Sequence, residues 1–232
     1  MGAHADKRAL VVLSGGQDST TCLYWAKREF AEVSALCFDY GQRHKVELDS
    51  AAAVAKLAGV ELERIELGSI FAGLSPLTNA SREVERYASA EVLPGGLEDT
   101  FVPGRNILFL SVAANRAYTL GADALIIGVS EEDFGGYPDC RADFIVAMEQ
   151  ALRLGLDTSL EILAPLARLD KAATVRLAQE LDGAMEALAY SHTCYEGESP
   201  PCGACHACLL RARGFAQAGV ADPLVERCAG SR

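Results

Sequence analysis

The chain has 232 residues, of which 50% are hydrophobic and 23% charged. This length allows one domain with an appendage or two small domains, and the composition excludes a disordered, collagenous or membrane-embedded chain. With 21 basic and 32 acidic side chains, the formal net charge is −11, which opposes binding to nucleic acid or to an anionic lipid surface. We therefore expect a small molecule or another protein as the partner.

The start of the chain shows no apolar signal-peptide core, so we expect the protein to stay in the cytoplasm. No stretch of the sequence approaches the roughly 20 apolar residues of a membrane helix. The eight cysteines are not expected to form disulfides in a reducing compartment. Half of them crowd together near the C-terminus, which favours a metal site.

Short apolar runs alternate with helical patterns along the first half of the chain. Strands are predicted over residues 9–13, 33–38, 65–67 with an alternating lead-in, and 124–129, and helices over 19–30, 45–58 and 107–120. This order predicts an α/β fold whose mostly parallel sheet is covered on both faces. Its ligand crevice should lie beyond the carboxyl ends of the strands.

The later part of the chain has a different character. Residues 75–103 are rich in proline, glycine and charge and read as a long excursion or flap. Strand signals weaken from about residue 157, and a helix is predicted to start at an Asp170 cap. We divide the chain into an α/β domain over residues 1–156 and a small helical, metal-bearing subdomain over residues 157–232.

The segment 13–20 lies directly after the first predicted strand and opens the first predicted helix. Glycines at such a turn can adopt positive φ and let backbone N–H groups converge, and the helix macrodipole favours an anion. No Gly-Lys pair of a P-loop is present, which excludes the common kinase motif. Asp18 either caps the helix or holds Mg²⁺ against phosphates. The residues expected to bind a nucleotide are Leu13, Ser14, Gly15, Gly16, Gln17, Asp18, Ser19 and Thr20.

Further polar segments follow predicted strands or border predicted helices. Arg43 can grip a carboxylate or phosphate through two parallel hydrogen bonds, and Arg105 should point to the site while Asn106 caps the helix. Lys171 can offset phosphate charge or stay solvated. The catalytic candidates are Asp18, Arg43, Arg105 and Lys171. The substrate-binding candidates are Tyr40, Gln42, Arg43, Asn106, Asp133, Tyr137 and Asp139.

The clustered cysteines are Cys194, Cys202, Cys205 and Cys208, with spacings of seven, two and two residues between them. Four thiolates at this spacing can converge on one tetrahedral ion, and zinc is the natural occupant. A closed set of four protein ligands leaves no place for water, so the role would be structural. An iron–sulfur cluster and a redox dithiol remain alternatives, and His206 could replace one cysteine.

The string from Ser14 to Ser19 is similar to the pyrophosphate loop of the ATP pyrophosphatases. With segments 38–44, 101–110 and 128–141, Pro165-Leu166, Lys171 and the terminal cysteines, it resembles the 7-cyano-7-deazaguanine synthase family over about residues 8–219. The resemblance implies an adenine nucleotide alpha hydrolase-like (Rossmann-like) sheet, with ATP, Mg²⁺ and one structural Zn²⁺ per chain. It also implies a homodimer.

The activity that the resemblance implies is the conversion of 7-carboxy-7-deazaguanine and ammonia to 7-cyano-7-deazaguanine, through adenylated acid and amide, in queuosine precursor biosynthesis. Residues 191–193 and 181–190 match the family pattern less well. A related enzyme that transfers the activated acyl group to another amine, including one on a protein, therefore stays open. A tRNA-modifying enzyme of the superfamily would need a basic groove, and a non-catalytic zinc module would not turn over ATP.

Overall fold

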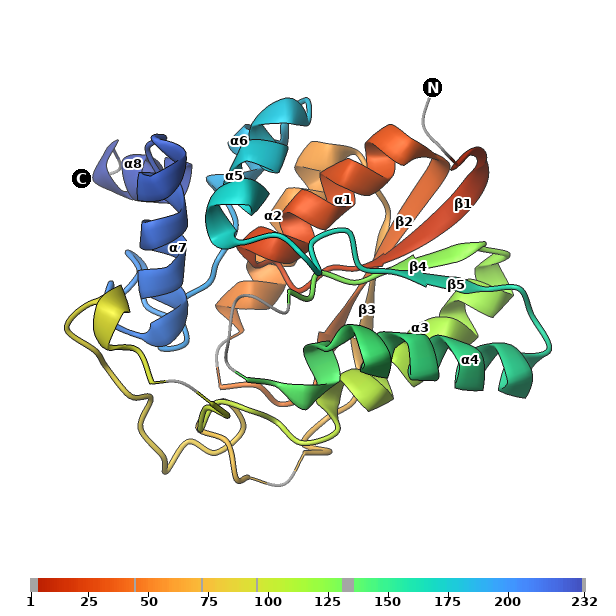
Figure 1. The fold of residues 1–232 in the computed structure, drawn as a ribbon, viewed down its shortest axis with the longest axis horizontal. Helices are drawn as coiled ribbons and strands as arrows, with labels where there is room; N and C mark the ends of the chain where they lie inside the picture. The colour runs from red at the N-terminus through yellow and green to blue at the C-terminus, as the bar shows by residue number, and fades with distance from the viewer. Residues whose placement is uncertain (1–3, 44, 72, 95, 131–135, 231–232) are drawn as a thin grey trace.

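The computed structural model describes residues 4–43, 45–71, 73–94, 96–130 and 136–230. Five strands form one parallel sheet in the order β3-β2-β1-β4-β5, with helices on both faces (Figure 1). The strands are β1 (His4–Val12), β2 (Phe30–Asp39), β3 (Leu62–Glu66), β4 (Ala124–Ile126) and β5 (Glu161–Leu163). The predicted α/β class with a covered parallel sheet is confirmed.

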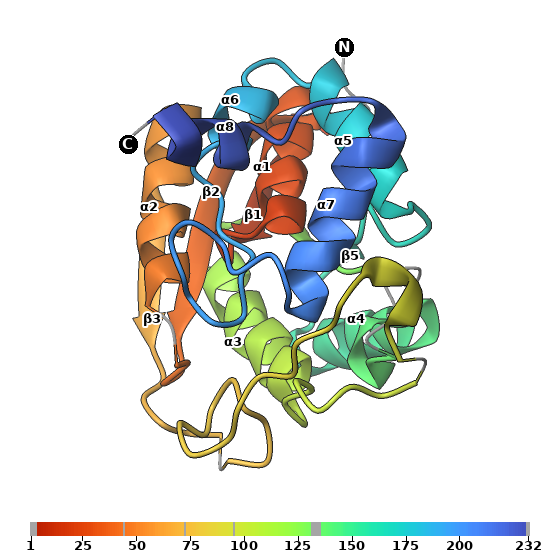
Figure 2. The same cartoon turned by 90° about the vertical axis from the view of Figure 1, so that its left-hand side faces the viewer.

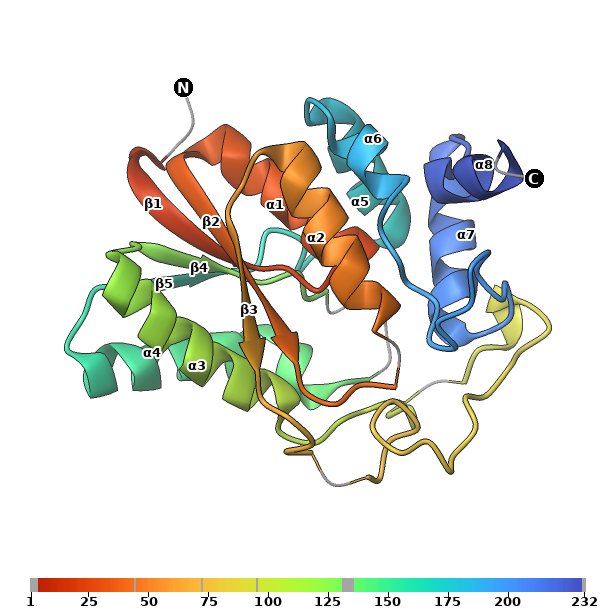
Figure 3. The same cartoon turned by 180° about the vertical axis from the view of Figure 1, so that it is seen from behind.

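The helices form two layers around the sheet. One face carries α1 (Gln17–Glu29) and α2 (Val46–Ala58), and the other carries α3 (Arg105–Leu120) and α4 (Ala142–Leu156), as Figure 3 shows from behind. Beyond α1 lie α5 (Lys171–Glu180), α6 (Ala184–Leu188), α7 (His206–Ala218) and α8 (Pro223–Gly230), which Figure 2 shows side-on. No helix among the described residues has the length and apolar character needed to cross a membrane.

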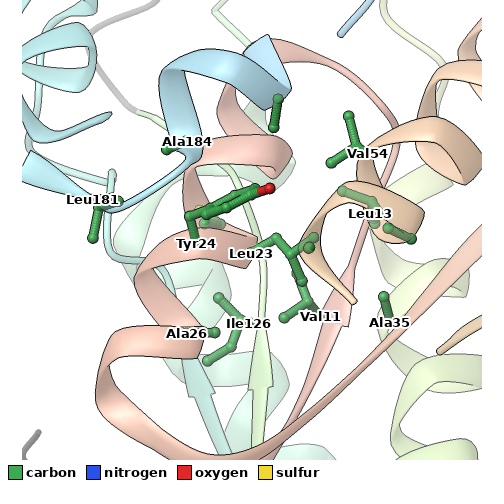
Figure 4. Close-up of a cluster of buried hydrophobic side chains, with 14 of the residues drawn as sticks. Val11, Leu13, Leu23, Tyr24, Ala26, Ala35, Val54, Ile126, Leu181 and Ala184 are labelled. Atoms are coloured by element: carbon green, nitrogen blue, oxygen red, sulfur yellow. The ribbon is translucent and has the colours of Figure 1, made fainter. Parts of the chain in front are cut away.

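Alternation along β1 explains why the sheet has two cores. Val11 faces α1 and α2, whereas Leu10 and Val12 face α3 and α4. Successive side chains of a strand point to opposite faces, so a continuous apolar run is what a doubly covered strand needs. Figure 4 shows the first core, in which Leu181 and Ala184 join the residues of β1 and α1.

The C-terminal helices therefore share a core with the sheet. The division at residue 157 stays a prediction, and β5 lies on its C-terminal side although it belongs to the sheet. The sequence patterns missed both β5 and α4. Strand β5 is only three residues long, which leaves too short a pattern to recognise in the sequence.

The strand order places a crevice between β1 and β4. The chain leaves β1 toward α1 on one face of the sheet, and it leaves β4 toward α4 on the other face. A ligand crevice forms where two such connections diverge beyond the carboxyl ends of neighbouring strands. The segment 13–20 lies at that point, as the sequence predicts.

Candidate active site

A cavity of about 740 Å³ lies at this edge of the sheet, a volume in the range of small-molecule sites. The predicted site residues that line it are Leu13, Ser14, Gly16, Gln17, Asp18, Ser19, Tyr40, Gln42, Arg43, Arg105, Asn106, Tyr137 and Lys171. The predicted residues absent from its lining are Gly15, Thr20 and Asp139. Asp133 lies outside the described residues. The structure thus gathers most of the candidates around one space.

The turn before α1 is shaped for an anion. Gly16 is the N-cap residue and has no side chain to cap the helix, so the N–H groups of the first helical turn are not taken by a capping side chain of the N-cap residue. The hydroxyls of Ser14 and Ser19 lie 3.0 Å apart across the turn, and the Gly16 N–H donates to Ser14 Oγ at 3.3 Å. The interpretation of Asp18 as the helix cap is wrong, because this carboxylate turns toward α5.

Close backbone packing explains Gly15 in the turn and Gly128 in the segment that packs against it. Gly15 has φ +86°, and a Cβ there would lie 2.3 Å from the Glu47 carbonyl oxygen. The expectation of positive φ holds for Gly15 but not for Gly16, whose φ is −79°. Gly128, at the end of β4, brings that strand against α1, because a Cβ there would lie 2.9 Å from the Ser19 nitrogen. The sequence analysis did not identify this role of Gly128.

Asp18 and Lys171 form a partly buried ion pair in the cavity. Lys171 Nζ donates to Asp18 Oδ2 at 2.7 Å, and the lysine side chain is 9% exposed. The second oxygen, Asp18 Oδ1, is buried without a hydrogen-bond partner among the described residues, as are both polar atoms of the Gln17 amide. Because unpaired buried polar atoms cost free energy, this end of the cavity is built for a polar ligand.

The start of α3 differs from the prediction. Gly104 takes the left-handed conformation with φ 77°, and the helix already begins at Arg105, so Asn106 is not the cap. The Asn106 side chain instead donates to the Asp139 carbonyl at 2.9 Å, and the Asp139 carboxylate accepts the Asn106 N–H at 3.3 Å. Asn106 and Asp139 therefore fix the start of α3 to the segment after β4.

Arg105 is a half-buried cation that lines the cavity. Burial alone would lower the pKa of its guanidinium. The nearby Tyr40, Tyr137 and Asp139 outweigh this effect, so the pKa is raised above its ordinary value. The side chain therefore stays charged. Arg43 is exposed, and its guanidinium donates to the Arg82 carbonyl at 2.9 Å. Arg105 is thus the better placed of the two to hold an anionic group deep in the site.

Gln42 uses its side chain to shape the turn after β2. Its Oε1 accepts the Tyr40 N–H at 2.8 Å, and its Nε2 donates to the Phe38 carbonyl at 3.0 Å. Both ends of the amide are therefore paired with backbone, which orients Tyr40 against Phe109, with ring centroids 5.3 Å apart.

Glu47 and Tyr195 are among the lining residues that the sequence analysis did not identify. Burial raises the pKa of Glu47, in the first turn of α2, to about 7, against the opposing effect of Arg105. An acidic residue in a first helical turn is usually a solvated partner of the helix dipole, so the pattern gave no signal. Tyr195 also lines the cavity and was overlooked because only its neighbour Cys194 belongs to a metal-binding pattern.

The four cysteine sulfurs lie within 4.8 Å of one another. Cys202 Sγ and Cys208 Sγ are 3.9 Å apart, close to the edge of about 3.8 Å that a tetrahedron with Zn–S bonds near 2.3 Å requires. Backbone N–H groups of Cys202 and Cys205 donate to sulfurs of the cluster at 3.4 and 3.3 Å, which stabilises thiolates. The donor set therefore fits a structural zinc ion.

His206 is not a member of this metal-binding group, so its suggested replacement of a cysteine is wrong. Its Nε2 lies 2.6 Å from Glu98 Oε1 instead. The cysteine loop also carries the predicted flap: Arg86 pairs with Cys205 in an antiparallel bridge, and the Tyr87 N–H donates to the Ala204 carbonyl at 2.8 Å. In Figure 2 this segment runs beside the start of α7.

The molecule combines a parallel α/β sheet, a turn suited to an anion at the switch point of the sheet, and a four-cysteine cluster that fits a metal ion. We call the loop that carries these cysteines, residues 194–208, the knuckle. These features are typical of a nucleotide-binding α/β protein. The family model of "Queuosine biosynthesis protein QueC" matches residues 8–219. The chain therefore belongs to the QueC family.

Three relatives span nearly the whole chain, and each is named 7-cyano-7-deazaguanine synthase. The protein of Chromobacterium violaceum is 56% identical and covers 98% of this chain and 97% of its own. Those of Laribacter hongkongensis and Gloeobacter violaceus are 52% and 54% identical, covering 97% and 94% of this chain and 96% and 95% of their own. A solved structure of a predicted tRNA methyltransferase subunit from Methanocaldococcus jannaschii matches with a TM-score of 0.48 and 16% identity over 75% of each chain, too distant to bear on function.

Proposed function

We propose that this chain converts 7-carboxy-7-deazaguanine, ammonia and ATP to 7-cyano-7-deazaguanine. The observation that carries the proposal is the 52–56% identity, over nearly the full length of both chains, to three proteins named 7-cyano-7-deazaguanine synthase. The cavity supports it, because a turn suited to an anion and the half-buried Arg105 line the same space.

The first step activates the carboxylate. One carboxylate oxygen attacks the α phosphorus of ATP, the bond to the bridging oxygen breaks, and pyrophosphate leaves. The turn at residues 14–19 and the Lys171 ammonium offset the charge that builds on the departing pyrophosphate. Arg105 holds the substrate's carboxyl end by charge and hydrogen bonding.

Two further exchanges complete the reaction. Ammonia displaces AMP from the acyl adenylate and loses a proton, which gives the amide. The amide oxygen then attacks the α phosphorus of a second ATP and displaces pyrophosphate, and elimination of AMP with loss of two protons leaves the nitrile. Two ATP are consumed per nitrile, and the chain acts by positioning and charge compensation rather than through a side-chain nucleophile.

The proposal includes Mg²⁺ at Asp18. The buried, unpaired Oδ1 of Asp18 is a hard oxygen donor of the type that Mg²⁺ prefers, and the ion would supply charge compensation for the phosphates. We also propose a homodimer and a location in the cytoplasm, in keeping with a biosynthetic enzyme of small molecules.

The test is to incubate the purified chain with ATP, ammonium and 7-carboxy-7-deazaguanine and to weigh the products by mass spectrometry. The proposal predicts the nitrile with AMP and pyrophosphate. A reaction that stops at the amide, or an acyl group found on a protein amine, would instead assign the chain to a related transfer enzyme. Absence of any deazaguanine product would contradict the proposal.

A further inference from the structure

A chain of hydrogen bonds runs behind one wall of the cavity and is not used by the proposed reaction. The Tyr137 hydroxyl lies 2.6 Å from Thr100 Oγ1. Thr100 Oγ1 in turn donates to Glu98 Oε2 at 3.1 Å. The other oxygen of Glu98 lies 2.6 Å from His206 Nε2. Tyr137, Tyr195 and His206 all line the cavity.

The direction of donation along this series of hydrogen bonds follows from Glu98, where the series ends. A carboxylate only accepts hydrogen bonds, and each hydroxyl has a single proton to donate. Since Thr100 gives its proton to Glu98, Tyr137 must donate to Thr100. The Tyr137 proton is thus directed to Thr100, which does not line the cavity, and the hydroxyl of Tyr137 keeps lone pairs for a ligand.

The position of Glu98 makes this polarity firm. Glu98 is 8% exposed and Thr100 is 6% exposed, so water does not readily replace either partner. Glu98 belongs to the flap and His206 begins α7 beside the cysteine loop, so the contact also fixes the flap segment against the knuckle. Hydrogen bonds in a buried, connected network strengthen one another.

We propose that Glu98, acting through Thr100, makes the Tyr137 hydroxyl in this wall of the cavity a hydrogen-bond acceptor, which selects a base carrying N–H donors. The inference rests on the proposed function and deepens it: the wall suits the amino and ring N–H groups of a guanine-like substrate and disfavours a base that lacks the amino group. Glu98 and Thr100 are positioning residues here, since neither lines the cavity.

The test compares the binding of 7-carboxy-7-deazaguanine with that of its analogue without the 2-amino group, by calorimetry on the full zinc-loaded chain. The native chain should bind the amino compound about tenfold or more tightly, the scale of a well-placed polar contact. Thr100→Val leaves Tyr137 without its acceptor and should reduce this preference to less than about threefold. Thr100→Ser keeps the hydroxyl and should restore it.

An equal preference in the Val and Ser variants, or no preference in the native chain, would overturn the inference. Zinc content and melting temperature report whether Thr100→Val folds. If it does not, Tyr137→Phe breaks the same chain one link later, and an unchanged preference there would equally overturn the inference. Failure of the native chain to bind 7-carboxy-7-deazaguanine at all would instead contradict the proposed function.

Discussion

Lys171 and Asp18 form an ion pair at the proposed nucleotide site. The residues lie 153 positions apart in the sequence and 2.7 Å apart in the fold. Sequence analysis named both as catalytic candidates, but only the packing of α5 against α1 reveals that they form a pair. An ammonium in a partly buried site contributes more to charge compensation than one in water.

We expect Lys171→Met to lower the release of pyrophosphate from ATP by about a hundredfold or more, the scale found when one charge-stabilising donor is removed. The matched control is Lys7→Met, because Lys7 also pairs with a carboxylate, Glu161, but both side chains are 37% exposed. The control should retain nearly full activity. Equal rates of pyrophosphate release in the two variants would remove Lys171 from the site.

Glu47 should make the free energy of unfolding depend measurably on pH. Its pKa of about 7 lies above the ordinary value of 4.5 because of burial, so between these values the folded chain keeps a proton that the unfolded chain has lost. The stability that this proton contributes is present at low pH and is lost as pH rises through 7.

The Glu47→Gln variant should therefore lose less stability than the native chain between pH 5 and pH 8. Denaturant unfolding at both pH values measures the difference, which we expect to be about 1–3 kcal/mol. Parallel losses in the two proteins would show that the Glu47 carboxyl does not titrate in this way.

Among the elements, the contact between α5 and α7 places Lys171. A Cβ on Gly214 of α7 would lie 2.6 Å from the Cβ of Lys171 and 3.1 Å from its carbonyl carbon. Gly214→Ala should therefore push the two helices apart, lower the stability by about 1–3 kcal/mol and reduce pyrophosphate release.

Gly155→Ala in α4 is the matched control, because nothing lies within 4 Å of its added Cβ. It should leave activity unchanged and change stability by at most about 1 kcal/mol, toward greater stability, since alanine favours a helix. Denaturant unfolding and activity assays distinguish the two. A Gly214→Ala protein as stable and active as the Gly155→Ala protein would contradict this view of the α5–α7 contact.

The cysteine loop anchors the flap, so metal removal should act at a distance. The Tyr87 N–H bonds to the Ala204 carbonyl between Cys202 and Cys205, and Val84 packs in the cysteine cluster. Chelation should increase hydrogen exchange at the Tyr87 amide, while the amide of Val11 in the central strand keeps its protection. Unchanged exchange at Tyr87 in zinc-free protein would show that the flap is held independently of the knuckle.

At the scale of the whole molecule, the sequence predicted features formed by consecutive residues and did not predict contacts between residues far apart in the chain. The continuous apolar run in β1 and the turn after it predicted the central strand and the cavity at its end, because a buried parallel strand and an anion-binding turn have local signatures. Strand β5 is too short for such a signature. The contact between Glu98 and His206 joins residues 108 positions apart, and no spacing rule connects them.

The net charge of the protein and its similarity to known proteins both favour a small-molecule substrate. The formal charge of −11 becomes more negative when four thiolates bind one Zn²⁺, which disfavours a nucleic-acid substrate. The full-length relatives are named for a small-molecule synthase. In the proposed reaction, an oxygen of the substrate attacks ATP at its α phosphorus.

The most direct measurement uses 7-carboxy-7-deazaguanine with ¹⁸O in both carboxyl oxygens. Mass spectrometry of the products should find two AMP and two pyrophosphate per nitrile, with one ¹⁸O in each AMP and none in pyrophosphate. Release of ADP and phosphate, or AMP without the label, would contradict the account, because the substrate oxygen would not have attacked the α phosphorus.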